Sequence, residues 1–317
     1  MYFIDKRIEV IANQLKLLRI RDSREITDWV YKKGLFFRPE EADADGRAWE
    51  KFDCKTMRWY ATYDGSDKPE GAFEGYQGDC KGLQGEHYWF RGDITIPKEM
   101  ADKCVWMKIR TQIDEWDDGK NPQFLVFING KVTQGADMNH RDVRLFDSAV
   151  AGETITVDVQ AYTGTLHSEF NYLVDLYVLD EEINRLYYDI LVPLQAFPRM
   201  DADSKIRLDL QTVLNETINF LDLRTPYSEA FYASVRKAQS YITENLYEKM
   251  GGHDEVIATC IGHTHIDVAW WWTVAQTREK VVRSFATVLK LMDEYPNYKF
   301  RSSQPVLYQS LKERYPE

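Results

Sequence analysis

Cysteine is scarce in this sequence, and its few cysteines form no metal-binding or disulfide pattern. Cys54, Cys80, Cys104 and Cys260 are widely separated, and no C-x-x-C pair occurs. Isolated cysteines of this kind are typical of free thiols in a reducing compartment. The sequence therefore predicts a cytoplasmic protein.

Long apolar runs and an excess of basic residues are also missing. No stretch approaches the ~18 apolar residues of a membrane span, and Met1-Tyr-Phe-Ile-Asp-Lys-Arg7 places charges too early for a signal peptide. The 40 Lys and Arg residues against 51 Asp and Glu give a net charge of -11. This sign argues against nucleic acid or an anionic membrane as a partner.

The remaining composition is that of an ordinary globular protein. Its 317 residues, 44% of them hydrophobic and 29% charged, are enough for two domains with sizeable cores. Changes in pattern along the chain predict an α+β multi-domain protein. Its parts are an N-terminal helical segment (1–44), an antiparallel, jelly-roll-like β-sandwich (45–180), a helical linker (181–252) and the start of an α/β barrel (253–317).

Helical spacing of apolar residues defines the first and third of these parts. The first stripe consists of Ile4, Ile8, Ile11, Leu15 and Leu18. A second short helix is expected from Arg24 to Lys33. Three further stripes cover 186–194, 213–221 and 231–242, and prolines separate them.

Residues 45–180 instead carry short β-rich runs at the spacing of an antiparallel sandwich. These runs cover 88–96, 105–110, 124–128, 154–159 and 172–178. Asn129-Gly130 predicts a hairpin, because both positions tolerate positive φ. The order of strand, Phe-x-Asn-Gly hairpin and Ala-Gly-Glu-Thr-Ile strand resembles the jelly-roll accessory domains of glycosidases. Some such domains bind sugars, and most brace a catalytic domain.

Two polar clusters in the sandwich have competing interpretations. The acidic run Asp114–Asp118 around Trp116 could bind calcium or a sugar, but it lacks the EF-hand spacing. A solvated acidic turn is the favoured interpretation. His140 with Asp137 and Asp142 is interpreted as loop structure.

The main candidate site follows an apolar run from Val256 to Ile261. The run has no charge and many β-branched residues, as in a strand buried on both faces of a parallel sheet. His263, His265 and Asp267 come next at alternate positions, so an extended strand would place them on one side. Parallel α/β folds have their active sites at this end of the strands. Imidazole and carboxylate groups are good ligands for zinc-like cations.

The residues after this cluster predict a sugar-binding face and the beginning of a barrel. Trp270 to Trp272 provide an aromatic surface suited to a sugar ring. A capping box at Thr273 and Gln276 begins a helix that Pro296 ends, and 298–303 and 306–314 follow as strand and helix. A complete barrel needs roughly 200 residues or more. The chain is therefore expected to end inside its catalytic domain, as part of a longer enzyme.

The run Gly262-His-Thr-His-Ile-Asp-Val-Ala-Trp270 resembles the first motif of the glycoside hydrolase family 38 α-mannosidases. The similarity extends through Arg283–Pro296 and into Phe300–Gln304. The preceding region is similar in layout to the N-terminal extension of the cytosolic-type members.

The resemblance implies roles for three residues. His265 and Asp267 would bind the catalytic metal, which is zinc with cobalt as an alternative, and Trp270 would stack on the mannose. His263 matches a family position but is not implied as a ligand. The implied activity is retaining, metal-dependent hydrolysis of terminal α-linked mannose from oligosaccharides. The implied nucleophile lies beyond residue 317, so this chain alone is expected to be inactive.

Self-association is also expected. Cytosolic-type relatives are often oligomers, which implies a homo-oligomer. Open strand edges and uncovered helix faces, including Phe285 and Met292, would recruit other chains through residues 256–317.

Two other classes of protein fit parts of the same pattern. A metal-dependent amidohydrolase also begins its barrel with His-x-His, and there His263 and His265 would both be ligands. Asp267 and the tryptophans would then be incidental. Alternatively, the chain is a carbohydrate-binding or assembly module in which residues 45–180 are the functional part.

Overall fold

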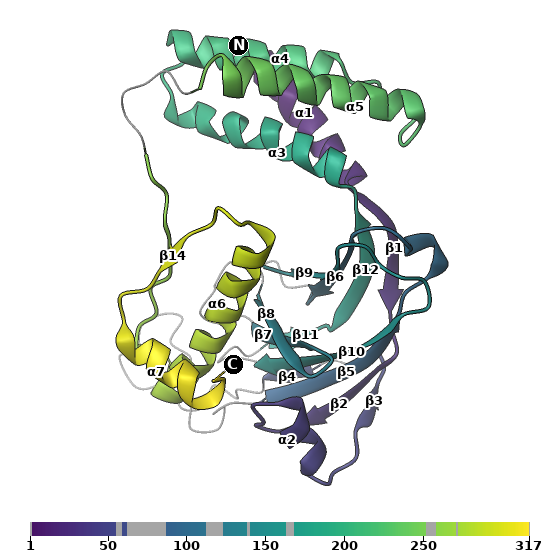
Figure 1. Cartoon of the computed structure of the whole chain (residues 1–317), viewed down its shortest axis with the longest axis vertical. Helices are drawn as coiled ribbons and strands as arrows, with labels where there is room; N and C mark the ends of the chain where they lie inside the picture. The colour runs from purple at the N-terminus through teal and green to yellow at the C-terminus, as the bar shows by residue number, and fades with distance from the viewer. Residues whose placement is uncertain are drawn as a thin grey trace. The chain divides into compact units, whose positions relative to one another are not determined.

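The computed structural model describes residues 2–54, 59–61, 87–111, 123–137, 140–162, 168–251, 258–270 and 272–316. Within them the protein is α+β, with helices and antiparallel strand pairs (Figure 1). The chain divides into two compact units. Unit 1 consists of Met1–Ser23 and Tyr177–Thr259, and unit 2 of Arg24–Leu176 and Cys260–Glu317.

Unit 1 is helical. Its elements are α1 (Tyr2–Leu18), α3 (Glu181–Ala196), a 3-10 turn (Phe197–Arg199), α4 (Lys205–Asn219), α5 (Glu229–Ile242) and a π-helical turn (Thr243–Glu248). Asp180, Ser204 and Ser228 cap α3, α4 and α5, because each side chain accepts a hydrogen bond from the backbone N–H three residues further on. Local capping therefore fixes the first residues of the helices that carry these three apolar stripes.

The four helices of unit 1 share one core. Ile8 and Leu15 of α1 are fully buried in the same cluster as Leu186, Leu214 and Phe231. Residues 1–23 of the predicted N-terminal part thus fold together with the predicted linker, because each amphipathic helix must bury its apolar stripe against another element.

The helix predicted from Arg24 to Lys33 is wrong, because strands occupy this range. β1 spans Ile20–Ile26 and β2 spans Trp29–Lys33. β2 pairs antiparallel with β5 (His87–Thr95), placing Tyr31 opposite Phe90. Trp29 is fully buried. Aromatic and β-branched residues suit such a half-buried pleated surface, and this pairing decides the structure.

Two sheets organise unit 2. The larger has the strand order β3-β2-β5-β10-β7-β8, and the smaller has the order β1-β12-β6-β9. The remaining strands are β3 (Glu50–Phe52), β10 (Thr154–Tyr162), β7 (Gln123–Ile128), β8 (Lys131–Ala136), β12 (Leu173–Leu179), β6 (Val105–Arg110) and β9 (Asp142–Phe146). A separate pair joins β4 (Trp59–Ala61) and β11 (Ser168–Phe170). Short helical segments are α2 (Pro39–Ala44) and a 3-10 turn (Lys98–Met100).

The predicted hairpin is confirmed. β7 and β8 pair antiparallel, and between them Asn129 and Gly130 have φ of 50° and 78°. The five β-rich runs coincide with β5, β6, β7, β10 and β12. Local sequence signals were sufficient here because turn chemistry and strand patterning agree.

Aromatic rings fill the space between the two sheets. The ring of Phe90 on β5 stacks on Tyr172, which directly precedes β12, with 3.9 Å between centroids. Trp29 meets Tyr172 edge to face at 5.1 Å. Complete burial raises the pKa of the Tyr172 hydroxyl well above its usual value, because the charged form would lose its solvation.

Helix α6 (Val274–Glu294) covers the other face of the larger sheet, alongside β7 and β8 (Figure 1). Buried residues from both sides form one cluster that includes Trp89, Leu125, Phe127, Val282 and Ala286. A side chain at Gly135 would clash with the backbone of Arg283, so the absence of a Cβ permits this approach. This helix explains why β7 and β10 are buried on both faces, whereas β6 alternates.

The apolar run before the histidines is not a buried strand where the structure describes it. Residues 256 and 257 lie outside the described residues, and 258–261 are exposed and irregular. Only Gly262–His263 forms a strand, β13, which pairs in parallel with β14 (Phe300–Arg301). A strand buried on both faces must be covered by other elements on each face. The described residues 258–261 are exposed and so lack this cover. Helix α7 (Pro305–Arg314) follows, so the order is strand, helix, strand, helix.

The helix face expected to be uncovered is largely covered. Phe285 is only 6% exposed and packs with Ile266, Val281 and Leu307. The expectation was wrong for Phe285 because α6 packs against the site loop and α7 as well as against the sheet.

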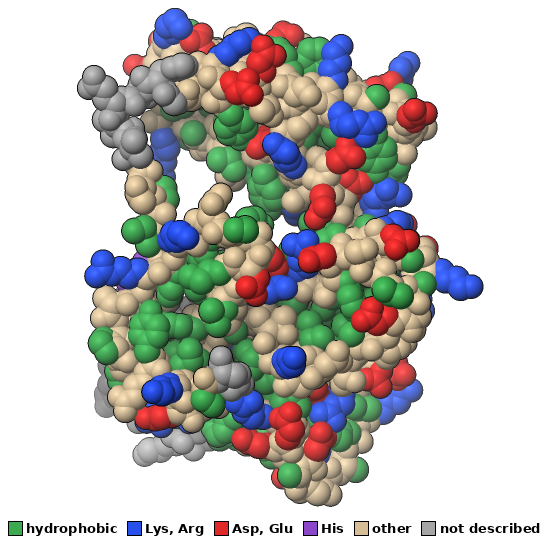
Figure 2. All heavy atoms as spheres, in the orientation of Figure 1, with side chains coloured by type: hydrophobic (Ala, Val, Ile, Leu, Met, Phe, Trp, Pro, Cys, Tyr) green, Lys and Arg blue, Asp and Glu red, His purple; other side chains and the backbone are tan. Residues whose placement is uncertain are grey.

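No described helix is both long enough and apolar enough to cross a membrane. On the face shown in Figure 2, acidic and basic side chains are interspersed.

Candidate functional site

The predicted site lies on the irregular segment that joins β13 to α6. At its centre Ile266 is 6% exposed and anchored in the cluster beneath. Its backbone N–H also points to Gln304 Oε1 at 3.4 Å. The side chains of His265 and Asp267 remain 68% and 42% exposed. Burial of the intervening residue therefore leaves both polar neighbours facing solvent.

His265 and Asp267 are in direct contact. His265 Nε2 lies 2.9 Å from Asp267 Oδ1, where the ionised carboxylate accepts a hydrogen bond from the ring N–H. One imidazole nitrogen and one carboxylate oxygen are donor types that zinc prefers. The pair fits part of a coordination shell. Among the described residues, no group of three or more His, Cys, Asp or Glu side chains is arranged to hold a metal.

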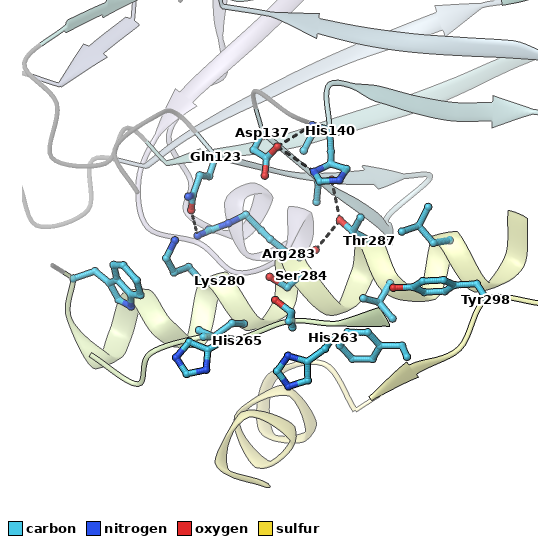
Figure 3. Close-up of a pocket in the computed structure, with 18 residues that line it drawn as sticks. Gln123, Asp137, His140, His263, His265, Lys280, Arg283, Ser284, Thr287 and Tyr298 are labelled. Atoms are coloured by element: carbon cyan, nitrogen blue, oxygen red, sulfur yellow. Dashed lines mark hydrogen bonds and ion pairs between the residues drawn. The ribbon is translucent and has the colours of Figure 1, made fainter. Parts of the chain in front are cut away.

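His263 and His265 line one side of a cavity of about 460 Å³. Figure 3 shows the two imidazoles on one side of α6, with Asp137 and His140 on the other side in this view. Arg283 from α6 also lines the cavity. The structure thus brings together the two histidines, whereas Asp267 contacts His265 outside the cavity lining.

Asp137 and His140, on the sandwich side of the cavity, lie in loop backbone as interpreted from the sequence, whereas that interpretation is wrong for Asp142, the first residue of β9. Asp137 Oδ1 accepts from the backbone N–H of His140 at 2.8 Å and lies 3.3 Å from its ring Nδ1. Asp142 is on β9, with its carboxylate 4.0 Å from Lys108 Nζ. The acidic run Asp114–Asp118 lies outside the described residues.

Trp270 lies on the same loop as His265 and Asp267 and is 69% exposed. Its ring meets Trp272 edge to face, with 5.9 Å between centroids. Trp271 lies outside the described residues. Lys280 Nζ lies 4.4 Å from the ring centre of Trp272, on the side of α6. Trp270 therefore presents an open aromatic surface, while Trp272 packs against the helix.

A buried polar network joins α6 to the sandwich. His87 Nε2 lies 2.8 Å from Glu279 Oε2, and Arg283 Nη1 lies 3.8 Å from the same carboxylate oxygen. Arg283 also donates to Gln123 Oε1. Burial lowers the pKa of the Arg283 guanidinium from its usual value, and Glu279 opposes this shift. Sequence reasoning missed this network because His87 and Glu279 are 192 positions apart, and no spacing rule relates them.

The loop and part of the cavity lining belong to a segment with known relatives. Residues 255–317 match the family described as glycosyl hydrolases family 38, N-terminal domain. The chain is 24% identical to alpha-mannosidase G of Dictyostelium discoideum over 261 residues, which are 76% of this chain and 22% of that protein. It is 27% identical to an alpha-mannosidase of Saccharomyces cerevisiae over 255 residues, which are 72% of this chain and 22% of that protein.

The chain is similar to glycoside hydrolase family 38 through this segment. It spans about a fifth of the length of the curated relatives it matches. Among solved structures, a β-glucuronidase from Ruminococcus gnavus in complex with D-glucuronic acid matches 51% of this chain and 30% of that one. The TM-score is 0.31 and the sequence identity 11%.

Proposed function

We propose that this chain is part of a retaining, metal-dependent exo-α-mannosidase that removes terminal α-linked mannose from oligosaccharides. The observation that carries the proposal is the contact between His265 Nε2 and Asp267 Oδ1, inside the segment that matches family 38. The α-mannosidases that match about three quarters of the chain support mannose as the sugar.

In this proposal His265 and Asp267 hold a zinc or cobalt ion together with ligands outside the chain. When bound, the ion acts as a Lewis acid and template for sugar hydroxyls. Ile266 holds the two ligands on the outer side of the loop through its buried side chain. Trp270 offers its exposed ring to the apolar face of the mannose.

A retaining glycosidase also needs a carboxylate nucleophile and an acid/base about 5 Å apart. We place the nucleophile beyond residue 317, and therefore expect no activity from the chain of 317 residues. The sandwich would brace the catalytic domain, because its larger sheet supports α6.

Location and assembly form a further part of the proposal. Cys54, Cys104 and Cys260 are free thiols, which suits the cytoplasm. We also propose a homo-oligomer, since exposed apolar side chains such as Leu289 and Tyr295 remain on the C-terminal segment.

The test is hydrolysis by the full-length protein of an aryl α-mannoside, compared with an aryl β-mannoside and a cyclic amide. The α-mannoside alone should be cleaved, chelation should abolish the rate, and zinc or cobalt should restore it. Proton NMR during the reaction should show the α-anomer of mannose as the first product. Cleavage of the cyclic amide instead would assign His263 and His265 to an amidohydrolase site. Glycan binding by the sandwich without any hydrolysis would favour a binding module.

A further inference from the structure

Thr277, on the first turn of α6, contacts the loop of the candidate site on either side of Trp270, at Val268 and at Trp272. It is 3% exposed. Its Oγ1 lies 2.7 Å from the backbone oxygen of Val268, and the indole N–H of Trp272 donates to it at 3.0 Å. We propose that Thr277 is a positioning residue that sets the place of Asp267 relative to Trp270.

The hydroxyl chemistry of Thr277 allows both contacts at once. A hydroxyl group has one proton to donate and two lone pairs that accept. The backbone oxygen of Val268 is the nearest acceptor, since those of Asp267 and Thr273 lie at 3.3 Å. The proton therefore goes to Val268, and a lone pair remains for Trp272. No apolar side chain of the same size can replace either interaction.

The two contacts flank Trp270, which is proposed to act on the sugar, and adjoin Asp267, which is proposed to hold the metal. Asp267 directly precedes Val268, and Trp270 lies between Val268 and Trp272. The backbone N–H of Trp270 also donates to the backbone oxygen of Trp272 at 3.2 Å. Thr277 thus ties the backbone before Trp270 and the indole of Trp272 to the helix.

The first turn of α6, which carries Thr277, is held in place by contacts of its own. Thr273 and Gln276 form a capping box in which each side chain accepts from the backbone N–H of the other residue. Gln276 Nε2 also contacts the hydroxyl of Tyr162 on β10. The sandwich therefore holds the turn of α6 from which Thr277 reaches the loop.

This inference rests on the proposed function, because it assigns the loop geometry a role in metal and sugar binding. Residues that orient metal ligands typically contribute about 10–100-fold to metal affinity or activity. We expect an effect in that range when the Thr277 hydroxyl is removed, seen in both metal affinity and kcat. A variant that only lowers the free energy of unfolding should leave the zinc affinity of the folded protein unchanged.

The experiment compares Thr277→Val, which keeps the shape, with Thr277→Ser, which keeps the hydroxyl. Thr217→Val is the matched control, since Thr217 is also a buried helical threonine, and its Oγ1 donates to Val213 O at 2.7 Å in unit 1. The first measurement is solvent exchange of the Trp272 indole N–H in the chain labelled with 15N-tryptophan, assigned with Trp272→Phe. Thr277→Val should accelerate this exchange by roughly tenfold, the effect of one lost hydrogen bond. Thr277→Ser and Thr217→Val should leave it unchanged.

The second measurement is zinc affinity, kcat and KM of the same variants in the full-length protein. The proposal expects Thr277→Val to weaken zinc binding and lower kcat, with rescue by Thr277→Ser. Unchanged indole exchange would refute the contact, and faster exchange with unchanged zinc affinity would refute the positioning role. If the unmodified protein has no mannosidase activity, the proposed function fails. The change in zinc affinity caused by Thr277→Val then decides by itself whether Thr277 is a positioning residue. Thr277→Ala, which removes the same hydroxyl with less bulk, replaces Thr277→Val should the latter not fold.

Discussion

The imidazole Nε2 of His87 lies 2.8 Å from Oε2 of Glu279, where α6 packs on the six-stranded sheet. Their side chains are only 2% and 8% exposed. Removing one partner of a buried pair leaves the other group without compensation for its lost hydration. This pair therefore makes the docking of α6 sensitive to a single substitution.

Glu279→Ala should lower the free energy of unfolding of unit 2 by about 3–5 kcal/mol, because the buried His87 and Arg283 lose their common partner. Urea unfolding followed by circular dichroism measures the change. Glu182→Ala is the control, since its pair with Arg236 is about half exposed and should contribute less than about 1 kcal/mol. Equal effects of both variants would show that the buried pair does not hold the helix.

Asp267→Asn and Trp270→Ala should affect the full-length enzyme differently. Asp267→Asn is nearly isosteric but removes a proposed negative ligand, so metal content should fall. Turnover should fall roughly a hundredfold or more, because several kcal/mol of transition-state stabilisation are lost. Excess zinc or cobalt should restore part of the rate. Trp270→Ala should lower activity at normal metal content, because Trp270 is proposed to stack on the sugar with its exposed ring and supplies no ligand to the metal. Metal analysis and kinetics decide, and full activity of Asp267→Asn at normal metal content would return the motif to a structural role.

The chain of 317 residues should bind zinc weakly or not at all. His265 and Asp267 supply two donors, fewer than the three or four protein ligands of typical zinc sites. Zinc content after dialysis and titration calorimetry test this expectation. One tightly bound zinc per chain that disappears in His265→Ala would mean that the ligand set is larger than proposed.

The chain should associate through exposed apolar residues of its C-terminal segment. Leu289, Tyr295 and Val306 are 60%, 59% and 46% exposed, and such groups favour contacts between chains. Light scattering over a concentration series should show dimers or larger species, and Leu289→Lys should reduce them. Val192→Lys, at a residue 60% exposed on α3 of unit 1, is the control. A strictly monomeric chain at high concentration contradicts the prediction.

Alkylation should separate the cysteines by their burial. Burial raises the pKa of the Cys54 thiol to about 11, with Glu25 and Asp53 adding to the shift. Because the thiolate is the nucleophile, Cys54 should react slowly at pH 8 and faster as the pH approaches 11. The exposed Cys260 should be modified first at pH 8. Peptide mapping after iodoacetamide treatment measures each site, and faster labelling of Cys54 at pH 8 would contradict its burial.

Part of the fold was predictable because it depends on neighbours in the sequence. Asn129-Gly130 produces its hairpin through two residues that accept positive φ. Thr273 and Gln276 form their capping box across one helical turn. The contact of His265 with Asp267 likewise needs only two positions on one segment.

Other parts depend on contacts that no local pattern contains. The range from Arg24 to Lys33 is strand because β2 finds a partner in β5, which overrides its weak helical spacing. The run up to Ile261 has the pattern of a buried strand, yet its described residues remain exposed, because burial requires neighbouring strands as well as apolar side chains.

The sequence by itself thus determined the helices with strong stripes, the β-hairpin, the family motif and the pair His265–Asp267. Only the tertiary structure decided that α6 packs on the sandwich, with Gly135 against its backbone and His87 against Glu279. It also decided that Thr277 holds the loop beside that pair. The physical reason is that local periodicity specifies which face of an element is apolar, whereas packing between distant segments specifies what that face meets.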